Sequence, residues 1–114
     1  MATIKRGDIY DVDWNPARGS EQNGRRPFLI IQNDIANEIS AYRITIVLAI
    51  SSKIKNYPSM VLVEPTAENG LSVTSEVNAG QIMTIDKDRL GKRIGSLSAA
   101  DMQKVTAKLT RMLG

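Results

Sequence analysis

Residues 17–27 of this chain read ARGSEQNGRRP, a stretch with three arginines, one carboxylate and two glycines but no large apolar side chain. Hairpin loops usually take roughly two to five residues, and longer loops are more often functional. Arg25 and Arg26 close the stretch, directly before Pro27. An arginine at the start of a strand can direct two donors at one phosphate, which a lysine cannot do. The stretch is therefore either a solvated connection between strands or a loop that binds an anion.

The hydroxyl groups of Ser51 and Ser52 are further candidate reactive groups. The chain has no histidine and no cysteine, so it lacks the usual activator of a serine nucleophile and the two side chains most used to bind metals. Asp11 and Asp13 alternate along a predicted strand, a spacing typical of a solvated face. We expect no metal and no cofactor, and any catalysis must proceed without histidine.

Five predicted strands must position these groups. Each is an alternating or continuous run of apolar and β-branched residues, and they span 8–14, 27–33, 43–52, 60–65 and 75–86. Ala79 and Gly80 interrupt the last of them. Small residues inside a strand indicate a bulge or a close approach of another backbone.

The strand at 43–52 alternates at its start, so its side chains should divide between two faces. The pattern predicts inward-facing side chains at Ile44, Ile46, Leu48 and Ile50. It predicts the opposite face for Arg43, Thr45 and Ser51. Ser51 and Ser52 are therefore expected to point to different sides of the sheet.

The pattern changes to a helical period near the C-terminus. Apolar side chains recur three and four residues apart, at Met102, Val105, Leu109 and Met112, as expected for helix packing against a core. Ser98 is placed to cap the start of this helix and Gly114 to end it, and a short helix is expected at 34–40. Successive strands followed by one helix predict a mainly β fold, a small antiparallel barrel with a C-terminal helix packed on it.

Length and charge limit the possible functions. A chain of 114 residues is expected to form a single domain, 1–114. Its 15 Lys and Arg against 12 Asp and Glu give a net charge of +3, which favours anionic partners. The N-terminus lacks the apolar segment of a signal peptide, and no apolar run approaches the ~18 residues of a membrane span. We expect a soluble, cytoplasmic protein with no membrane association.

Three ordered segments closely resemble the MazF/PemK family of toxin endoribonucleases: KRGDIYDVDWNP at 5–16, RGSEQNGRRPFLIIQND at 18–34 and GQIMTIDKDRL at 80–90. The resemblance implies an SH3-like barrel with a C-terminal helix and a homodimer. It implies an endoribonuclease toxin that cleaves single-stranded RNA (mRNA) sequence-specifically without a metal, inhibiting translation and growth. It also implies a cognate antitoxin protein, whose extended acidic tail would occupy the RNA groove.

The same resemblance assigns roles to individual residues. The family's catalytic arginine before proline falls on Arg26, and its strand-end threonine falls on Ser51. Substrate-binding roles are expected for Arg18, Ser20, Glu21, Gln22, Arg25, Ser52 and Gln81. Serine at 51 keeps the hydroxyl but loses the methyl group that restricts threonine's χ1.

Two further departures concern the third segment. Met83 stands where the family often has arginine, and Gly80 stands where an acidic residue is common. Both bear on substrate preference.

RNA carries its own nucleophile, the 2′-hydroxyl, so a histidine-free protein can still cleave it. Arg26 would hold the phosphate and stabilise the charge that gathers on its oxygens, while Ser51 would keep it in line for attack. The base is left open between Glu21, water and the substrate itself. The alternatives are a non-catalytic barrel similar to the gyrase-poisoning toxins and a homologue that only binds an antitoxin.

Overall fold

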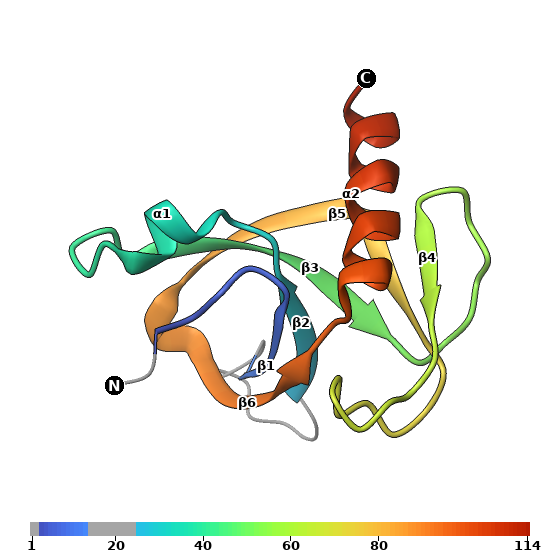
Figure 1. Ribbon diagram of the computed structural model, residues 1–114, viewed down its shortest axis with the longest axis horizontal. Coiled ribbons are helices and arrows are strands. Elements are labelled where there is room, and N and C mark those ends of the chain that lie inside the picture. The colour runs from blue at the N-terminus through green and yellow to red at the C-terminus, as the bar shows by residue number, and fades with distance from the viewer. Residues whose placement is uncertain (1–2, 14–24) are drawn as a thin grey trace.

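One antiparallel sheet of six strands forms the body of the computed structural model, which describes residues 3–13 and 25–114 (Figure 1). The strands are β1 (Asp8–Asp13), β2 (Arg25–Ile30), β3 (Ile44–Ser51), β4 (Met60–Val63), β5 (Ser75–Asp86) and β6 (Leu90–Ser96). Across the sheet they follow the order β4-β5-β3-β2-β1-β6. The helices are α1 (Asp34–Glu38) and α2 (Ala99–Leu113), with a 3-10 turn, η1 (Lys87–Arg89). The predicted mainly β fold with a C-terminal helix is confirmed.

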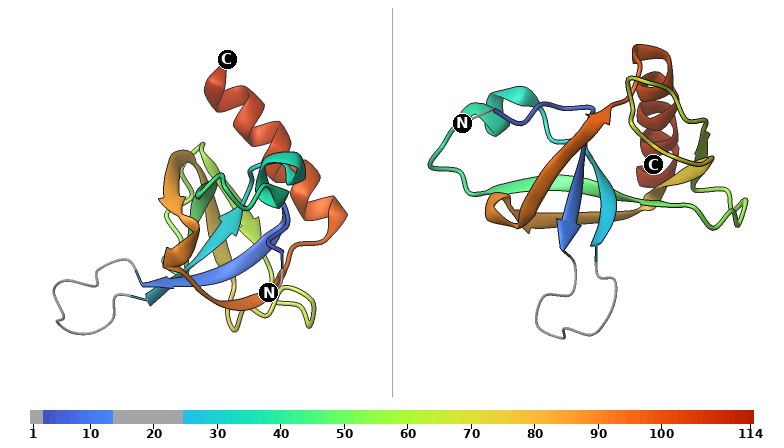
Figure 2. Two further views of the ribbon diagram at one scale, coloured as in Figure 1. Left: turned by 90° about the vertical axis from the view of Figure 1, so that its left-hand side faces the viewer. Right: turned by 90° about the horizontal axis from the view of Figure 1, so that it is seen from below.

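Two clusters of buried apolar side chains cover the two faces of this sheet. The helix-side core, which includes residues of α2, consists of Ile9, Leu29, Leu48, Ile50, Val61, Val63, Val77, Ala79, Leu97, Met102 and Val105. The barrel-side core consists of Tyr10, Val12, Phe28, Ile30, Val47 and Ile85. Figures 1 and 2 show the sheet bending, so that β1 and β6 turn out of the plane of β3 and β5. Strands β1, β2 and β3 contribute to both cores because successive side chains point to opposite faces.

Strand β3 is covered on both faces, which corrects one expectation from the sequence. Thr45, expected outward, is fully buried and donates its hydroxyl to Asn37 Oδ1 at 3.0 Å. Ile44, expected inward, is 38 % exposed. Val47 and Leu48 are both fully buried, on opposite faces. Since the strand is central, its alternation could not identify one buried face.

A bulge in β5 reverses which of its side chains face each core. Two residues of β3, Leu48 and Ile50, pair with Ile82 and Val77 of β5, which lie five positions apart. Odd-numbered side chains of β5 therefore face the helix-side core before the bulge and the barrel-side core after it. This bulge is the interruption predicted at residues 79–80.

Strand β6 was not predicted, so the expected count of five strands is wrong. Its sequence, LGKRIGS, holds two glycines and two cations, and glycine lowers β propensity. Pairing with β1 at the edge of the sheet makes it a strand, and its register shifts twice. Strand β2 also begins earlier than predicted, at Arg25, which lies opposite Asp13.

Helix α2 begins and ends where the sequence predicts. The Ser98 hydroxyl oxygen accepts the Asp101 N–H at 3.1 Å, and Gly114 follows the last turn. Val105 is fully buried, but Met112 is 45 % exposed, so its expected place in the core is wrong. The reason is visible in Figure 1, where the C-terminal end of α2 extends beyond the sheet. No helix in the described ranges has the length and apolar character needed to cross a bilayer.

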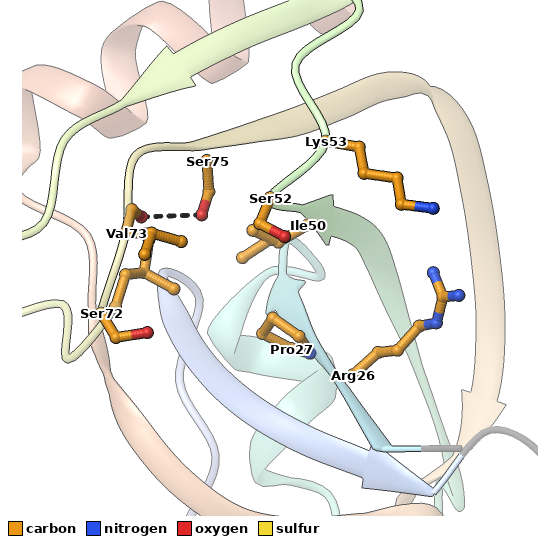
Figure 3. Close-up of a pocket in the computed structure, with 9 residues that line it drawn as sticks. Arg26, Pro27, Ile50, Ser52, Lys53, Ser72, Val73 and Ser75 are labelled. Carbon is orange, nitrogen blue, oxygen red and sulfur yellow. Dashed lines mark hydrogen bonds between the residues drawn. The ribbon is translucent and has the colours of Figure 1, made fainter. Parts of the chain in front are cut away.

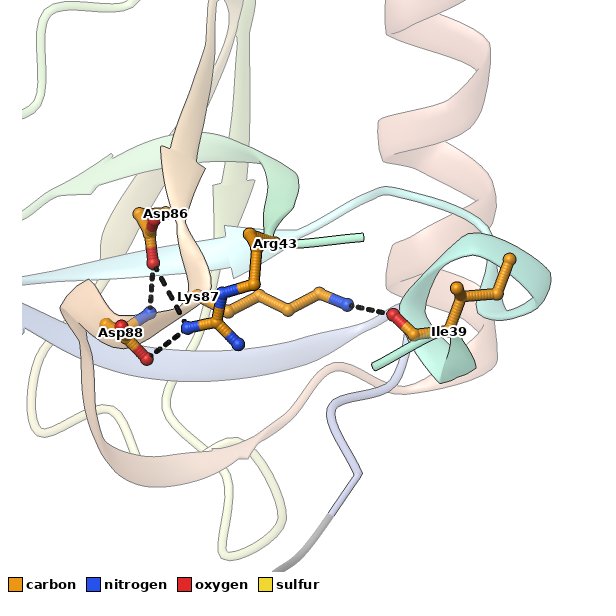
Figure 4. Close-up of polar contacts among 5 residues, drawn as sticks. All are labelled: Ile39, Arg43, Asp86, Lys87 and Asp88. Atoms are coloured by element: carbon orange, nitrogen blue, oxygen red, sulfur yellow. Dashed lines mark hydrogen bonds and ion pairs between the residues drawn. The ribbon is translucent and has the colours of Figure 1, made fainter. Parts of the chain in front are cut away.

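Charged groups attach the turn after α1 to the end of β5 (Figure 4). Arg43 donates to Asp88 and lies 3.6 Å from Asp86. The hydrogen bond to Asp88 and the charges of both carboxylates raise the pKa of Arg43 above its usual range. Lys87 Nζ donates to the Ile39 carbonyl oxygen at 3.2 Å. Because these groups are exposed, they set the path of the α1–β3 connection more than they stabilise the fold.

Tyr10 supplies a prediction about stability at alkaline pH. Burial, followed by the charge of Asp8, raises the pKa of Tyr10 above 10.0, although Arg93 opposes the shift. The stability that the neutral phenol contributes is therefore complete below pH 10.0 and is lost as pH rises through the folded-state pKa. We expect the free energy of unfolding of the parent to fall above that pH more steeply than that of Tyr10→Phe, by at most about 1.4 kcal/mol per pH unit. Urea titrations at several pH values measure this, and parallel slopes would contradict it.

Candidate functional site

Arg26 is the second residue of β2 and lies opposite Val12 of β1. Its side chain is exposed, and within residues 3–13 and 25–114 no ion pair or hydrogen bond to its guanidinium is found. Arg6, Arg43 and Arg93, by contrast, each contact a hydroxyl or carboxylate oxygen. An exposed guanidinium without a neutralising partner can bind an anion through two parallel hydrogen bonds.

A hollow of about 360 Å³ lies beside Arg26 (Figure 3). Its lining residues are Arg26, Pro27, Ile50, Ser52, Lys53, Leu71, Ser72, Val73 and Ser75. In Figure 3 the Arg26 guanidinium and the Lys53 ammonium group lie on the same side of the hollow, while Ser52 directs its hydroxyl toward the interior. Two cations, three hydroxyls and an apolar wall suit a ligand with phosphate and with apolar or aromatic parts.

Ser51 ends β3 and is partly buried. The last residue pair between β2 and β3 is Phe28 with Ala49, and continuing that register by two residues sets Arg26 opposite Ser51. Antiparallel neighbours at opposite positions share one face of the sheet. The Ser51 Oγ accepts the Lys53 N–H at 3.0 Å. Its own proton therefore stays available for donation to a ligand.

Ser51 and Ser52 are divided between two locations, as their adjacent positions predict. Ser52 lines the hollow together with Ile50, and Ser51 does not. The structure thus brings together Arg26, Ser52 and Lys53 around the hollow. Lys53 was not among the residues selected from the sequence, because a single lysine in a polar loop carries no distinguishing signal.

Glu76 was also missed. It lies opposite Ser51 in the β3–β5 pairing and is only 2 % exposed. Its two carboxylate oxygens accept the N–H groups of Lys55 and Asn56, each at 2.9 Å. Glutamate in a strand is usually solvated, so only the fold reveals that this one is buried under the β3–β4 loop.

The bulge in β5 brings this loop against Gly80. The Ala79 N–H donates to the Ser59 carbonyl at 2.9 Å, and the Ser59 hydroxyl bonds Asn78 Oδ1 at 3.1 Å. A Cβ at Gly80 would lie 3.0 Å from the Ser59 Cβ. Glycine at position 80 therefore relieves a tight contact with the loop, which an acidic side chain there would make.

Gln81 and Met83 follow the bulge on the barrel-side face. Gln81 is exposed, and its Oε1 lies 3.5 Å from Asn78 Nδ2, but it does not line the hollow. Met83 pairs with Val47 and packs partly buried against the barrel-side core. Methionine therefore replaces the family's frequent arginine with an adaptable apolar surface.

The far wall of the hollow, residues 71–75, is anchored to β6. The buried Asn69 side-chain oxygen accepts the Leu71 N–H at 2.9 Å. Gly70 has a φ of +69°, and a Cβ there would lie 2.3 Å from the Ile94 carbonyl oxygen. A Cβ at Gly95 would lie 2.3 Å from the Glu68 carbonyl oxygen. These two glycines let the backbones touch, which fixes the wall in place.

Several predicted site residues lie outside the described residues: Arg18, Ser20, Glu21 and Gln22. Arg25 is described as the first residue of β2. Within the described ranges, no three His, Cys, Asp or Glu side chains gather as a metal site requires.

Comparison with known proteins places the chain in a family. Residues 5–113 match the sequence model of the PemK-like, MazF-like toxins of type II toxin–antitoxin systems. The chain belongs to this family. It is 39% identical over 110 residues to endoribonuclease MazF9 of Mycobacterium tuberculosis, covering 93% of this chain and 92% of that protein. It is 43% identical over 107 residues to endoribonuclease EndoA of Bacillus subtilis, covering 93% and 90%.

Solved structures agree with this membership of the PemK-like, MazF-like toxin family. An endoribonuclease from a mycobacterial species, in complex with its cognate antitoxin, has a TM-score of 0.78 and 29% identity. That comparison covers 100% of this toxin and 96% of the other chain. A MazE–MazF crystal structure from Deinococcus radiodurans has a TM-score of 0.79 and 25% identity, covering 100% and 98%. The predicted family and barrel-like fold are thus confirmed, and the residue roles stay predictions.

Proposed function

We propose that this endoribonuclease toxin cleaves single-stranded RNA at Arg26 by attack of the substrate's 2′-hydroxyl on the adjacent phosphate, without a metal. The observation that carries the proposal is an exposed arginine, without a partner among the described side chains, beside a hollow lined with hydroxyls. The endoribonuclease relatives at 39% and 43% identity support the reaction class. Its substrate would be mRNA in the cytoplasm, so cleavage would stop translation and growth.

The reaction needs little covalent chemistry from the protein. The 2′-oxygen bonds to phosphorus as the bond from phosphorus to the 5′-oxygen breaks, and the 2′-proton is lost while the leaving oxygen gains one. The products are a 2′,3′-cyclic phosphate and a 5′-hydroxyl. The protein must align the attacking and leaving oxygens and stabilise the negative charge on the phosphate.

Arg26 and Ser51 would share these tasks. The guanidinium would bind two phosphate oxygens, an interaction worth roughly 3 to 4 kcal/mol in the transition state for a well-placed donor. Ser51 would donate its hydroxyl proton to the same phosphate, because its oxygen already accepts the Lys53 N–H. A guanidinium stays protonated in proteins, so Arg26 is not the general base.

The antitoxin would compete for the same surface. Structures similar to this chain include an endoribonuclease with its cognate antitoxin and MazE–MazF complexes. We expect this chain to have such a partner, with an extended acidic segment lying across Arg26 and Lys53. Carboxylates on that segment would occupy the positions of RNA phosphates, because both are anionic acceptors for the same donors.

A homodimer would cover the apolar sheet face that β3 and β5 expose beside α2. Ile44 and Ile82 are 38% and 40% exposed there, and Ile46 between them is partly exposed. The end of α2 adds Met112 and Leu113, 45% and 72% exposed. A second copy that covers these groups would remove contiguous apolar surface from water.

The first prediction for this site concerns Arg26. We expect Arg26→Lys to lower kcat/KM for RNA cleavage roughly 100-fold although it keeps the charge, because lysine cannot make the two-pronged contact. Arg111→Lys, an exposed position on α2, is the matched control and should be neutral. Ser51→Thr should be tolerated and Ser51→Ala should not. Equal rates for Arg26→Lys and the parent would refute the assignment.

The second prediction concerns the nucleophile. Deoxyribose at the single position 5′ to the cut phosphate should abolish cleavage while leaving binding nearly unchanged, because phosphate and base contacts elsewhere supply most of the affinity. A chelator should leave cleavage of the all-ribose RNA intact, and the products should carry a 5′-hydroxyl. Normal cutting of the deoxy-substituted RNA, or a requirement for added magnesium, would replace this mechanism with a hydrolytic one.

The third prediction concerns assembly. Sedimentation at micromolar concentration should show a dimer for the parent and a monomer for Ile82→Lys, because a lysine at the interface would be buried without a partner. Leu62→Lys is the matched control, since Leu62 is 50% exposed on the opposite face of the sheet. A parent that sediments as a monomer while fully active would show that the site does not need a second copy.

A further inference from the structure

Glu76 is a buried carboxylate that the mechanism above does not use. Only 2% of the residue is exposed, and the described contacts of its carboxylate are two backbone N–H groups, those of Lys55 and Asn56. No ion pair to it occurs among the described residues. Burying a charge is costly unless hydrogen bonds satisfy it, and an apolar residue of similar volume often serves stability equally well. A carboxylate at this position therefore indicates a role that an apolar side chain could not perform.

The contacts of Glu76 give the β3–β4 loop a defined shape. Two successive N–H groups point at one side chain, and Asn56 adopts a φ of 60°, the one positive φ of a non-glycine residue in the described ranges. Asparagine tolerates this left-handed conformation better than most residues. The other end of the loop is fixed by Ser59, which bonds Asn78 and accepts the Ala79 N–H.

Lys53 connects the β3–β4 loop to the proposed reaction site. Its N–H donates to Ser51 Oγ at 3.0 Å, so the position of the Lys53 backbone determines how the Ser51 hydroxyl is oriented. Its side chain lines the hollow beside Arg26 (Figure 3). Only Ile54 lies between Lys53 and Lys55, whose N–H is the first that Glu76 accepts. Release of Lys55 and Asn56 would therefore free Lys53 as well.

We propose that Glu76 is a positioning residue of the ribonuclease site, holding the β3–β4 loop so that Lys53 orients the Ser51 hydroxyl and lies beside Arg26. Glu76 does not touch the substrate, and it acts through the backbone of residues 53–56. The proposal rests on the proposed function, because it assigns Glu76 to the positioning of Ser51.

Glu76→Gln tests the proposal with little change in shape. The amide keeps one acceptor oxygen and turns an NH₂ toward the second backbone N–H, so one loop contact is lost. We expect kcat for RNA cleavage to fall roughly 10- to 100-fold, as small misplacements of reacting groups do. KM should rise by a smaller factor than kcat falls, because only Lys53 is released while Arg26 and the other residues that line the hollow keep their positions. Glu38→Gln, at an exposed position on α1 that does not line the hollow, makes the same charge change and should leave kcat unchanged.

A readout independent of activity separates positioning from general stability. Hydrogen exchange of the Lys53 amide, which bonds Ser51 and does not touch Glu76, should accelerate about tenfold or more in Glu76→Gln, since local opening sets exchange rates. It should be unchanged in Glu38→Gln. Lys55→Pro, compared with Lys55→Ala, is the second variant, and it removes one of the same two N–H donors from an exposed loop position whose φ is not positive. It should reproduce both effects, so the test does not depend on Glu76→Gln folding.

Three results would overturn the proposal. Unchanged Lys53 exchange in both variants, or faster exchange with unchanged kcat, would overturn the proposal. Loss of kcat in Glu38→Gln as well would assign the effect to net charge and would also overturn it. The proposed function fails by a different result, full cleavage by Ser51→Ala and Arg26→Lys.

Discussion

The pairing of β3 with β5 around one bulge is the constraint on which this structure depends. Before the bulge, β5 places Val77 in the helix-side core and Glu76 on the opposite face, beside the end of β3. After the bulge, the alternation is reversed and Ile85 enters the barrel-side core. Without the bulge, Val77 and Ile85, both odd-numbered, would face the same core, because a shift by one residue moves every following side chain to the other face. The extra residues also bring Gly80 against the β3–β4 loop.

The charges of the site follow from which arginines are already bound by acceptors of the same chain. Arg6, Arg43 and Arg93 are held by acceptors of the same chain, whereas Arg26 lies exposed beside a hollow with Lys53. Substrate RNA would bring both the nucleophile and the negative charge, so the protein's part is to align and neutralise them. That division explains how a chain without histidine and cysteine belongs to a family of toxins whose relatives here are endoribonucleases.

The two departures from the family pattern, Gly80 and Met83, have different structural consequences. A side chain at position 80 would contact Ser59 tightly, because a Cβ there would lie 3.0 Å from the Cβ of this residue in the loop that carries Lys53. Met83 packs partly buried on the barrel-side core, where it exchanges a fixed charge for an adaptable apolar surface. The first concerns the packing of the β3–β4 loop, and the second concerns the surface beside the barrel-side core.

The sequence by itself determined the fold class, the C-terminal helix with its Ser98 cap, the interruption of β5 and the family. These follow from local signals such as periodicity, capping residues and ordered motifs, which act over a few neighbouring residues. Only the tertiary structure decided that LGKRIGS forms an edge strand, that Thr45 is buried on Asn37, and that Glu76 lies under a loop. Each of these depends on pairing between segments far apart in the chain. Burial of a polar group is tolerated where a distant partner satisfies its hydrogen bonds, and no pattern along the chain specifies that partner.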